Sequence, residues 1–249
     1  MTHGLGLSLD GDRSADRLRH HGLYLQQAPL TDPAARPLRI VLLGPPASGK
    51  GTQGKRLAES LGLGYLSTGA VLREQVENQT ELGKTAAPIL ARGHYLPDDL
   101  MCRILADWLA KQSGGWVLDG FPRSLPQAVF LDEWLSQRGL AIDCALSLEV
   151  PFDVLLERIS QRVECPDCRW TGQVRQLLDS KYCPVCGQVA QSRADDSEEN
   201  FRKRHQEFEK LTLPVIAHYR DENRLFACDA TAPQDEVAAK ILAHFINPS

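Results

Sequence analysis

The 249-residue sequence has no excess of basic residues, no long apolar run and no internal repeat. Its 28 lysines and arginines are outweighed by 32 aspartates and glutamates, so the net charge of −4 argues against a general electrostatic footprint for nucleic acid. No apolar run approaches the roughly 20 residues that span a bilayer. The N-terminus, with Asp10, Asp12 and Asp16, is unlike a signal peptide. We therefore expect a soluble cytoplasmic enzyme without nucleic-acid or membrane partners.

The arrangement of apolar residues predicts an α/β fold over residues 38–249. Hydrophobic residues make up 43% of the chain, which is enough for a sizeable core. Runs typical of buried strands alternate with patterns typical of helices. Pro214 should kink the helix expected at 200–221. The strand runs are 38–43, 64–66, 116–118, 144–148 and 225–228, and the helical patterns are 98–112, 152–162, 200–221 and 234–245. This order favours a mostly parallel sheet covered by helices on both faces.

Three segments do not fit this alternation. Residues 1–37 are interrupted by glycines and closed by prolines, and we interpret them as an N-terminal extension of unknown role. Residues 67–96 have helical character without a strand, and we call them the helical insert. Residues 163–196 are polar and rich in cysteine, and we call them the cysteine-rich insert. Since ligands of parallel α/β folds bind beyond the carboxyl ends of the strands, we expect both inserts to project over the ligand site.

A phosphate-binding loop is the most informative motif. The segment Gly44-Pro45-Pro46-Ala47-Ser48-Gly49-Lys50-Gly51-Thr52 follows the first strand run and precedes a stretch that can continue as a helix. Glycines let backbone N–H groups approach phosphate oxygens, and the positive end of the helix adds to this attraction. Lys50 supplies a mobile charge, and Thr52 a hydroxyl for Mg²⁺. The alternative is a plain turn between two core elements, which the strand before it and the helix after it disfavour.

Four of the seven cysteines predict a metal site. They form two knuckles separated by fourteen residues, with Cys165 and Cys168 in the first and Cys183 and Cys186 in the second. Tetrahedral Zn²⁺ fits this set best, with iron as the second choice, and two disulfides or four unpaired thiols are the alternatives. Because four thiolates leave no open coordination position, the metal should be structural. Cys102, Cys144 and Cys228 are interpreted as small buried hydrophobic residues.

Further motifs follow in order along the chain. Ser67-Thr68-Gly69 lies three residues before Arg73, and Leu118-Asp119-Gly120-Phe121-Pro122-Arg123 follows the third strand run. Arg158 and Arg162 are expected on one helical face at a spacing of four. With the phosphate-binding loop, these motifs resemble the adenylate kinase family of nucleoside monophosphate kinases over residues 38–246. The cysteine-rich insert resembles the zinc-bearing lid of its long bacterial members.

The resemblance implies a P-loop fold and phosphoryl transfer from ATP to AMP by a monomer, with Mg²⁺ bound to ATP. It implies ATP contacts from Gly44, Pro45, Ala47, Ser48, Gly49, Lys50, Gly51, Thr52 and Arg158. It implies AMP contacts from Thr68, Arg73, Leu96, Gly120, Arg123, Gln127, Arg193 and Arg204. The catalytic group would be Lys50, Arg123, Arg158, Arg162, Arg193, Arg204 and Asp119, the last holding Mg²⁺ through its waters. Asp195 and Asp196 would orient these arginines or cap the following helix.

The sequence departs from the family pattern at several positions, which keeps other functions open. Ala70 replaces an acidic residue, and Ala230 and Ala232 replace a glycine and a lysine near the last strand. A related kinase with a different donor or acceptor is therefore an alternative. Two less favoured ones are a zinc-ribbon nucleic-acid-binding ATPase and a catalytically silent nucleotide sensor.

Overall fold

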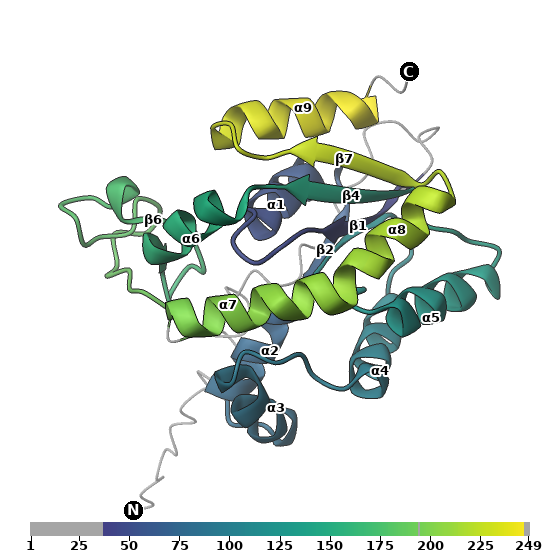
Figure 1. Ribbon diagram of the computed structural model, residues 1–249, viewed down its shortest axis with the longest axis horizontal. Helices are drawn as coiled ribbons and strands as arrows, with labels where there is room; N and C mark the ends of the chain where they lie inside the picture. Colours follow the sequence, from purple (N-terminus) through teal and green to yellow (C-terminus); the bar gives the residue numbers. More distant parts are fainter. Residues whose placement is uncertain (1–36, 194, 247–249) are drawn as a thin grey trace, which may run out of the picture.

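The fold is described from a computed structural model, in residues 37–193 and 195–246. Within these residues a five-stranded parallel sheet has the order β2-β3-β1-β4-β7 (Figure 1). Its strands are β1 (Arg39–Leu43), β2 (Gly64–Ser67), β3 (Trp116–Asp119), β4 (Cys144–Glu149) and β7 (Leu225–Asp229). Every predicted strand run is a strand. Because parallel strands are buried on both faces, they appear in the sequence as continuous apolar runs.

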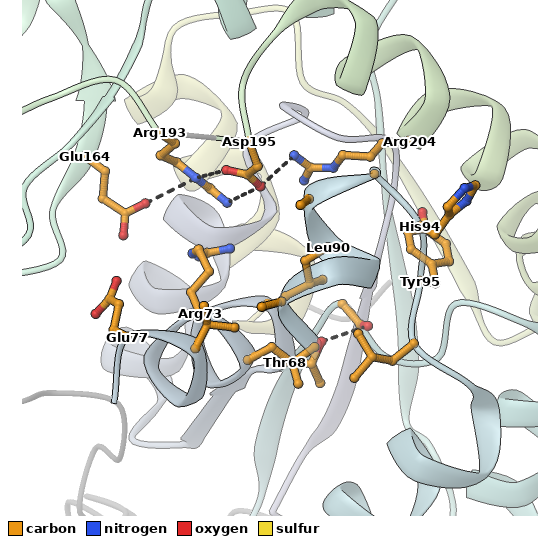
Figure 2. Close-up of a pocket in the computed structure, with 18 of the residues that line it drawn as sticks. Thr68, Arg73, Glu77, Leu90, His94, Tyr95, Glu164, Arg193, Asp195 and Arg204 are labelled. Carbon is orange, nitrogen blue, oxygen red and sulfur yellow. Dashed lines mark hydrogen bonds and ion pairs between the residues drawn. The ribbon is translucent and has the colours of Figure 1, made fainter. Parts of the chain in front are cut away.

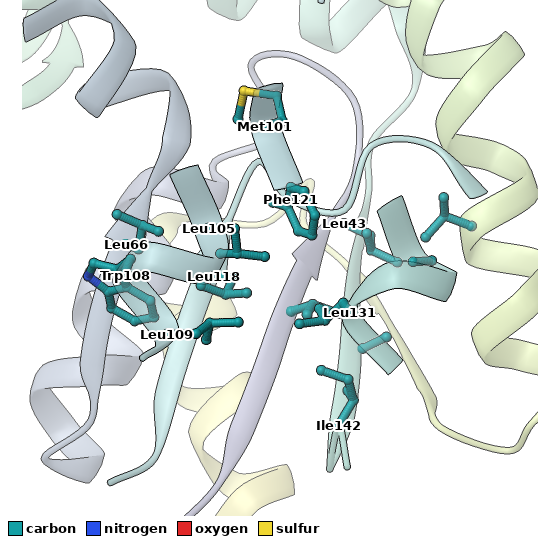
Figure 3. Close-up of a cluster of buried hydrophobic side chains, with 14 of the residues drawn as sticks. Leu43, Leu66, Met101, Leu105, Trp108, Leu109, Leu118, Phe121, Leu131 and Ile142 are labelled. Carbon is teal, nitrogen blue, oxygen red and sulfur yellow. The ribbon is translucent and has the colours of Figure 1, made fainter. Parts of the chain in front are cut away.

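Helices cover both faces of this sheet. Helices α1 (Lys50–Leu61) and α9 (Gln234–Ile246) pack on the face that receives Ile40 and Leu42. Helices α4 (Asp98–Leu109), α5 (Leu125–Ser136) and α8 (Leu213–Asp221) pack on the face that receives Val41 and Leu43. Figure 3 shows this second layer, where side chains of α4 and α5 meet Leu43 and Leu118. The alternation of neighbouring β1 side chains between two clusters confirms the predicted α/β architecture.

Three local predictions need correction. The predicted helix 152–162 is α6 (Phe152–Ser160), so Arg162 does not share a helical face with Arg158. Arg162 instead begins β5 (Arg162–Glu164), which pairs antiparallel with β6 (Thr171–Gln173), and this pairing supplies its backbone partners. Helix α5 was not predicted from the sequence. Cys102 is only partly buried, whereas Cys144 and Cys228 are buried as expected.

The long helical pattern 200–221 is divided into three segments. Helix α7 (Glu198–Glu207) continues into a π-helical segment at Phe208–Thr212, and α8 follows. Pro214 lies in the first turn of α8. A proline lacks the N–H group that an α-helical turn needs, so the regular hydrogen-bond ladder changes directly before it.

The two inserts have the expected content. The helical insert contains α2 (Thr68–Glu77) and α3 (Glu81–Ala91). The cysteine-rich insert contains β6, a short 3-10 segment at Val174–Gln176 and most of β5, and it lies beyond the carboxyl ends of β4 and β7 (Figure 1). The predicted extension 1–37 lies almost wholly outside the described residues. None of the helices in the described part of the chain has the length and apolar character needed to cross a membrane.

Candidate active site

The phosphate-binding loop connects β1 to α1. Gly44 has a φ of 136°, and a Cβ there would lie 2.7 Å from the carbonyl oxygen of Leu148, so only glycine fits. Gly49 adopts φ 99° at the N-cap of α1, which leaves the first turn of the helix facing the loop. Lys50 folds back over the loop, where its Nζ donates to the carbonyl oxygens of Gly44 and Pro45, both at 2.7 Å. The predicted order of strand, glycine-rich loop and helix is therefore present, and phosphate binding by the loop stays a prediction.

Lys50 carries the positive charge of the phosphate-binding loop, and its pKa is strongly lowered. Burial lowers its pKa to about 7, and the positive charges of Arg123 and Arg204 act in the same direction. The carboxylate of Asp119 opposes them. An anion placed beside Lys50 would favour its charged form, so the loop is suited to phosphate rather than to a neutral ligand.

Asp119 ends β3 beside the loop and is 8% exposed. Its Oδ2 accepts hydrogen bonds from the Tyr65 hydroxyl and the Ser67 hydroxyl, both at 3.1 Å. The same oxygen lies 3.6 Å from the position of a Cβ on Gly51. This geometry directs a fixed carboxylate toward the first turn of α1, where a hydrated cation bound to loop phosphates would lie.

A cavity of about 540 Å³ lies between the helical and cysteine-rich inserts, and we call it the insert cavity (Figure 2). One wall is apolar and includes Leu72, Val76, Leu90 and Met101. All eight residues predicted to contact AMP line it, namely Thr68, Arg73, Leu96, Gly120, Arg123, Gln127, Arg193 and Arg204. Its lining also includes Glu77, Tyr95, Glu164 and Arg169, which the sequence did not mark as site residues. An apolar wall beside an arginine cluster suits a nucleotide, with its base on one side and its phosphate on the other.

Two arginines of the insert cavity, Arg123 and Arg73, differ in how their guanidinium groups are partnered. The Nε of Arg123 donates to the carbonyl oxygen of Gly120 at 2.7 Å, and its guanidinium carbon lies 4.4 Å from the centre of the Tyr95 ring. Arg73 has a buried Nε with no hydrogen-bond partner among the described residues. Burial lowers the pKa of Arg73 to about 10, and the neighbouring Arg193 contributes to this shift. A buried donor beside a like charge is stabilised when an anion binds.

Carboxylates hold the remaining arginines. Asp195 accepts from Nε and Nη2 of Arg193 and from Nη1 of Arg204, each at 3.2 Å. Asp196 accepts a pair of hydrogen bonds from Arg162, of which the Nε bond is 2.6 Å long. Helix α7 is capped instead by Ser197, whose hydroxyl accepts from the backbone N–H of Asn200 at 3.2 Å. Of the two predicted roles for Asp195 and Asp196, orienting the arginines is therefore confirmed.

The comparisons with known proteins agree with this geometry. A sequence model of the family described as "Adenylate kinase" matches residues 42–224. The chain belongs to the adenylate kinase family. It is 40% identical over 212 residues to the adenylate kinase of Thermosipho melanesiensis, covering 82% of this chain and 98% of that protein. The adenylate kinases of Streptomyces coelicolor and Finegoldia magna are 38% and 37% identical, each over 82% of this chain and 97% of the relative.

Membership in the adenylate kinase family makes the chain a nucleoside monophosphate kinase, which is a phosphotransferase. The zinc-ribbon nucleic-acid-binding ATPase is thereby set aside. In this kinase, Thr68 donates to the carbonyl oxygen of Gly120 at 2.9 Å. The amide of Gln127 accepts from the Arg123 backbone N–H at 2.8 Å and donates to Asp98 at 2.7 Å. Both amide atoms thus already have protein partners.

Arg158 lies apart from the insert cavity, on the other side of the phosphate-binding loop. Its Nη2 donates to the carbonyl oxygen of Ala230 at 2.7 Å, and its Nη1 lies 3.5 Å from the carbonyl oxygen of Ser48. Arg158 thereby joins α6 to the loop and to the segment after β7. The two predicted arginines of the α6 region therefore serve different parts of the kinase, because Arg162 turns toward Asp196.

The four knuckle cysteines converge as predicted for a metal site of the kinase. Their sulfur atoms all lie within 4.8 Å of one another, with 3.4 Å between Cys165 and Cys186 and 3.6 Å between Cys168 and Cys183. The cysteines are free, and a disulfide would need about 2.05 Å, so the alternative of two disulfides is wrong. Zinc–sulfur bonds of about 2.3 Å in a tetrahedron place sulfurs about 3.8 Å apart, which these distances fit.

Proposed function

We propose that this chain is an adenylate kinase that reversibly transfers the γ-phosphoryl group of ATP to AMP and forms two ADP. The observation that carries the proposal is a convergence of cations. Five arginines line the insert cavity, and two of them, Arg123 and Arg204, also act electrostatically on Lys50 in the phosphate-binding loop. Phosphoryl transfer requires donor and acceptor phosphates to be aligned and their charge to be offset at one point.

The donor phosphates bind at the loop, through Gly44, Pro45, Ala47, Ser48, Gly49, Lys50, Gly51 and Thr52. Lys50 exchanges its loop carbonyl partners for phosphate oxygens, and the N-terminus of α1 adds partial positive charge. Arg158 completes this side, since it already bridges the loop and the segment after β7.

The acceptor nucleotide binds in the insert cavity. Arg73 and Arg123 hold its phosphate, because Arg73 has an unpartnered buried donor and Arg123 is fixed by Gly120 and Tyr95. Arg193, which lines the same cavity, also contacts this phosphate. The base lies against the apolar wall, near Thr68, Leu96 and Gln127. For Gln127 to read the base, it must exchange its bond to Asp98 for one to the nucleotide.

During transfer, an oxygen of the acceptor phosphate forms a bond to the γ-phosphorus as the bond to the ADP leaving group breaks. Arg162, Arg193 and Arg204 offset the negative charge of the transferring group, and Asp195 and Asp196 fix their orientation. The two inserts exclude water, which would otherwise accept the phosphoryl group.

Two metals complete the proposal. Mg²⁺ would offset the charge of the ATP phosphates, and Asp119 and Thr52 are the residues that would hold it beside the loop. Zinc bound by Cys165, Cys168, Cys183 and Cys186 stabilises the cysteine-rich insert and takes no part in chemistry. The kinase acts as a monomer without nucleic acid, as the family resemblance implies for the monomer and the net charge of −4 favours for the nucleic acid.

The test is ADP formation from ATP and AMP in a coupled assay with Mg²⁺. The wild-type protein is expected to be active, and Lys50→Ala and Arg123→Ala are expected to be strongly impaired. Lys55→Ala, one turn further along α1, is the matched control and should retain activity. GTP in place of ATP, and other nucleoside monophosphates in place of AMP, test the alternative donor and acceptor. A protein that binds ATP and AMP without forming ADP would contradict the proposal and favour the nucleotide sensor.

A further inference from the structure

A chain of alternating charges crosses from the helical insert to the cysteine-rich insert. The Nη1 of Arg169 donates to Oε1 of Glu77 at 2.9 Å, and its Nη2 donates to the second oxygen of the same carboxylate. The Nη1 also lies 3.9 Å from Oε1 of Glu164. Oε2 of Glu164 lies 3.4 Å from Nε of Arg193. Figure 2 shows Glu77 and Glu164 on the same side of the insert cavity, with Arg193 beyond Glu164.

The backbone of the first cysteine knuckle positions Arg169 for these ion pairs. Arg169 follows Cys168 and adopts φ 59°, while Gly187 follows Cys186 in the second knuckle and adopts φ 74°. The two knuckles are thus equivalent, but the first carries a long cationic side chain at a position that favours glycine.

Glu164 depends on its cationic neighbours. Its side chain is 12% exposed, and its Oε2 is buried without a hydrogen bond in the described part of the chain. A buried carboxylate without a nearby cation is costly, and Arg169 and Arg193 are the two cations that lie close to Glu164. Loss of Arg169 would leave Arg193 as its close partner and draw that guanidinium away from Asp195.

We propose that Arg169 is a positioning residue that joins the two inserts across the insert cavity and, through Glu164, sets the orientation of Arg193 toward the acceptor phosphate. The assignment of the acceptor phosphate rests on the proposed function. Arg169 itself touches no reacting atom, and its effect is on the closed arrangement of the inserts and on one arginine. The ion pair with Glu77 is exposed, with 50% of the Glu77 side chain accessible, and such a pair contributes little by itself. The effect of Arg169 therefore also depends on its contact with the buried Glu164.

The kinetic test compares Arg169→Gln, Glu77→Gln and their double variant. Arg169→Gln should raise the KM for AMP about fivefold, which corresponds to about 1 kcal/mol, while the KM for ATP stays within about twofold. Glu77→Gln should have a smaller effect, because the contact of Arg169 with Glu164 remains. In the Glu77→Gln background, Arg169→Gln should add less than it does alone. Arg169→Lys should restore the KM only in part, since a lysine cannot make the paired bonds.

Arg175→Gln is the matched control, because Arg175 is an exposed arginine of the same insert with no ion pair among the described residues. An equal effect of Arg169→Gln and Arg175→Gln would overturn the proposal, as would an equal rise in both KM values. Zinc content is measured for each variant. If Arg169→Gln loses zinc, Glu77→Gln still tests the contact from α2, far from the knuckle in sequence.

Hydrogen exchange without substrates provides a readout independent of activity. Arg169→Gln should speed exchange in the last turn of α2 and in residues 162–173 by about twofold or more, because both ends of the contact are released. Unchanged exchange would overturn the link between the inserts. If the wild-type protein forms no ADP, the proposed function fails, but this measurement still decides whether Arg169 joins the inserts.

Discussion

Replacing Asp195 by asparagine removes one charge at the centre of the arginine cluster and keeps the shape of the side chain. Burial acts to raise the pKa of Asp195, but Arg193 and Arg204 outweigh it and lower the pKa to about 2, from a usual value of 3.8. The side chain is 28% exposed. A shift of about two pKa units corresponds to about 2 kcal/mol of unfolding free energy at pH 7.

The sign of the pH dependence follows from the direction of this shift. A carboxyl group whose pKa is lowered in the folded protein stabilises the fold above its unfolded pKa, and this contribution is lost as the pH falls through the folded pKa. The difference between wild type and Asp195→Asn should therefore be full at pH 7 and decrease between about pH 4 and pH 2.

Urea unfolding at pH 7 and at pH 3 measures this difference. Asp179→Asn is the control, since Asp179 is an exposed carboxylate of the same insert whose φ of 48° asparagine also tolerates. In kinetics, Asp195→Asn should lower kcat without raising the KM for AMP, because it loosens two arginines while removing a negative charge from the insert cavity. Equal stability at pH 7, or an undiminished difference at pH 3, would refute the reasoning.

Three further predictions follow from individual side chains. Because the pKa of Lys50 is about 7, ATP binding at pH 8 should take up a proton, and the KM for ATP should rise roughly tenfold per pH unit above 7. Calorimetry in buffers of different ionisation enthalpy measures the proton uptake. A KM for ATP that does not change with pH would contradict this prediction. Chelation of the metal should lower the melting temperature of the wild type but not of Cys183→Ala, and equal responses would place the metal elsewhere. Ala70→Asp adds the first acidic residue to the first turn of α2, so it should raise stability by about 0.3–1 kcal/mol. It should also lower the Mg²⁺ concentration for half-maximal turnover. Thermal unfolding and a Mg²⁺ titration measure the two effects, and unchanged values would mean that alanine at position 70 affects neither stability nor Mg²⁺ dependence.

The sheet and the phosphate-binding loop were predictable because their signals are local. Each parallel strand is a continuous apolar run, and the loop is one uninterrupted segment. Helix α5 escaped prediction because apolar side chains occupy much of its surface, with Leu131 and Leu135 buried and Phe130 and Trp134 packed against the same cluster. A helix that is apolar on several sides lacks the one-sided pattern by which helices are recognised.

The predicted end of α6 failed for a different reason. The apolar pattern of Phe152–Ser160 continues into Val163, so periodicity alone places Arg162 on the helix. In the structure Gln161 caps the helix, and the pairing of β5 with β6 determines the next residues. That pairing is a tertiary contact within the cysteine-rich insert, and no spacing in the sequence specifies it.

Contacts between the inserts were equally invisible to sequence reasoning. Glu77 and Arg169 are 92 residues apart, and each by itself is an ordinary charged residue. The arginines were identified because their joint placement resembles the motif positions of the adenylate kinase family. Asp195 and Asp196 were named as orienting or capping residues, but Glu164 was not identified, since it differs from other acidic residues only in where the fold places it.

These carboxylates explain how an anion-binding site is built in an acidic protein. Arginines gathered at one point repel one another, and burial lowers the pKa of Arg73 and Arg204 to about 10. Asp195 and Glu164 offset this repulsion and direct the guanidinium groups of Arg193 and Arg204. An entering phosphate then meets cations that are already oriented, so less ordering is needed at the moment of transfer. The same arrangement makes the arginines depend on their carboxylates, which is why a single neutral substitution at Asp195 should affect both stability and kcat.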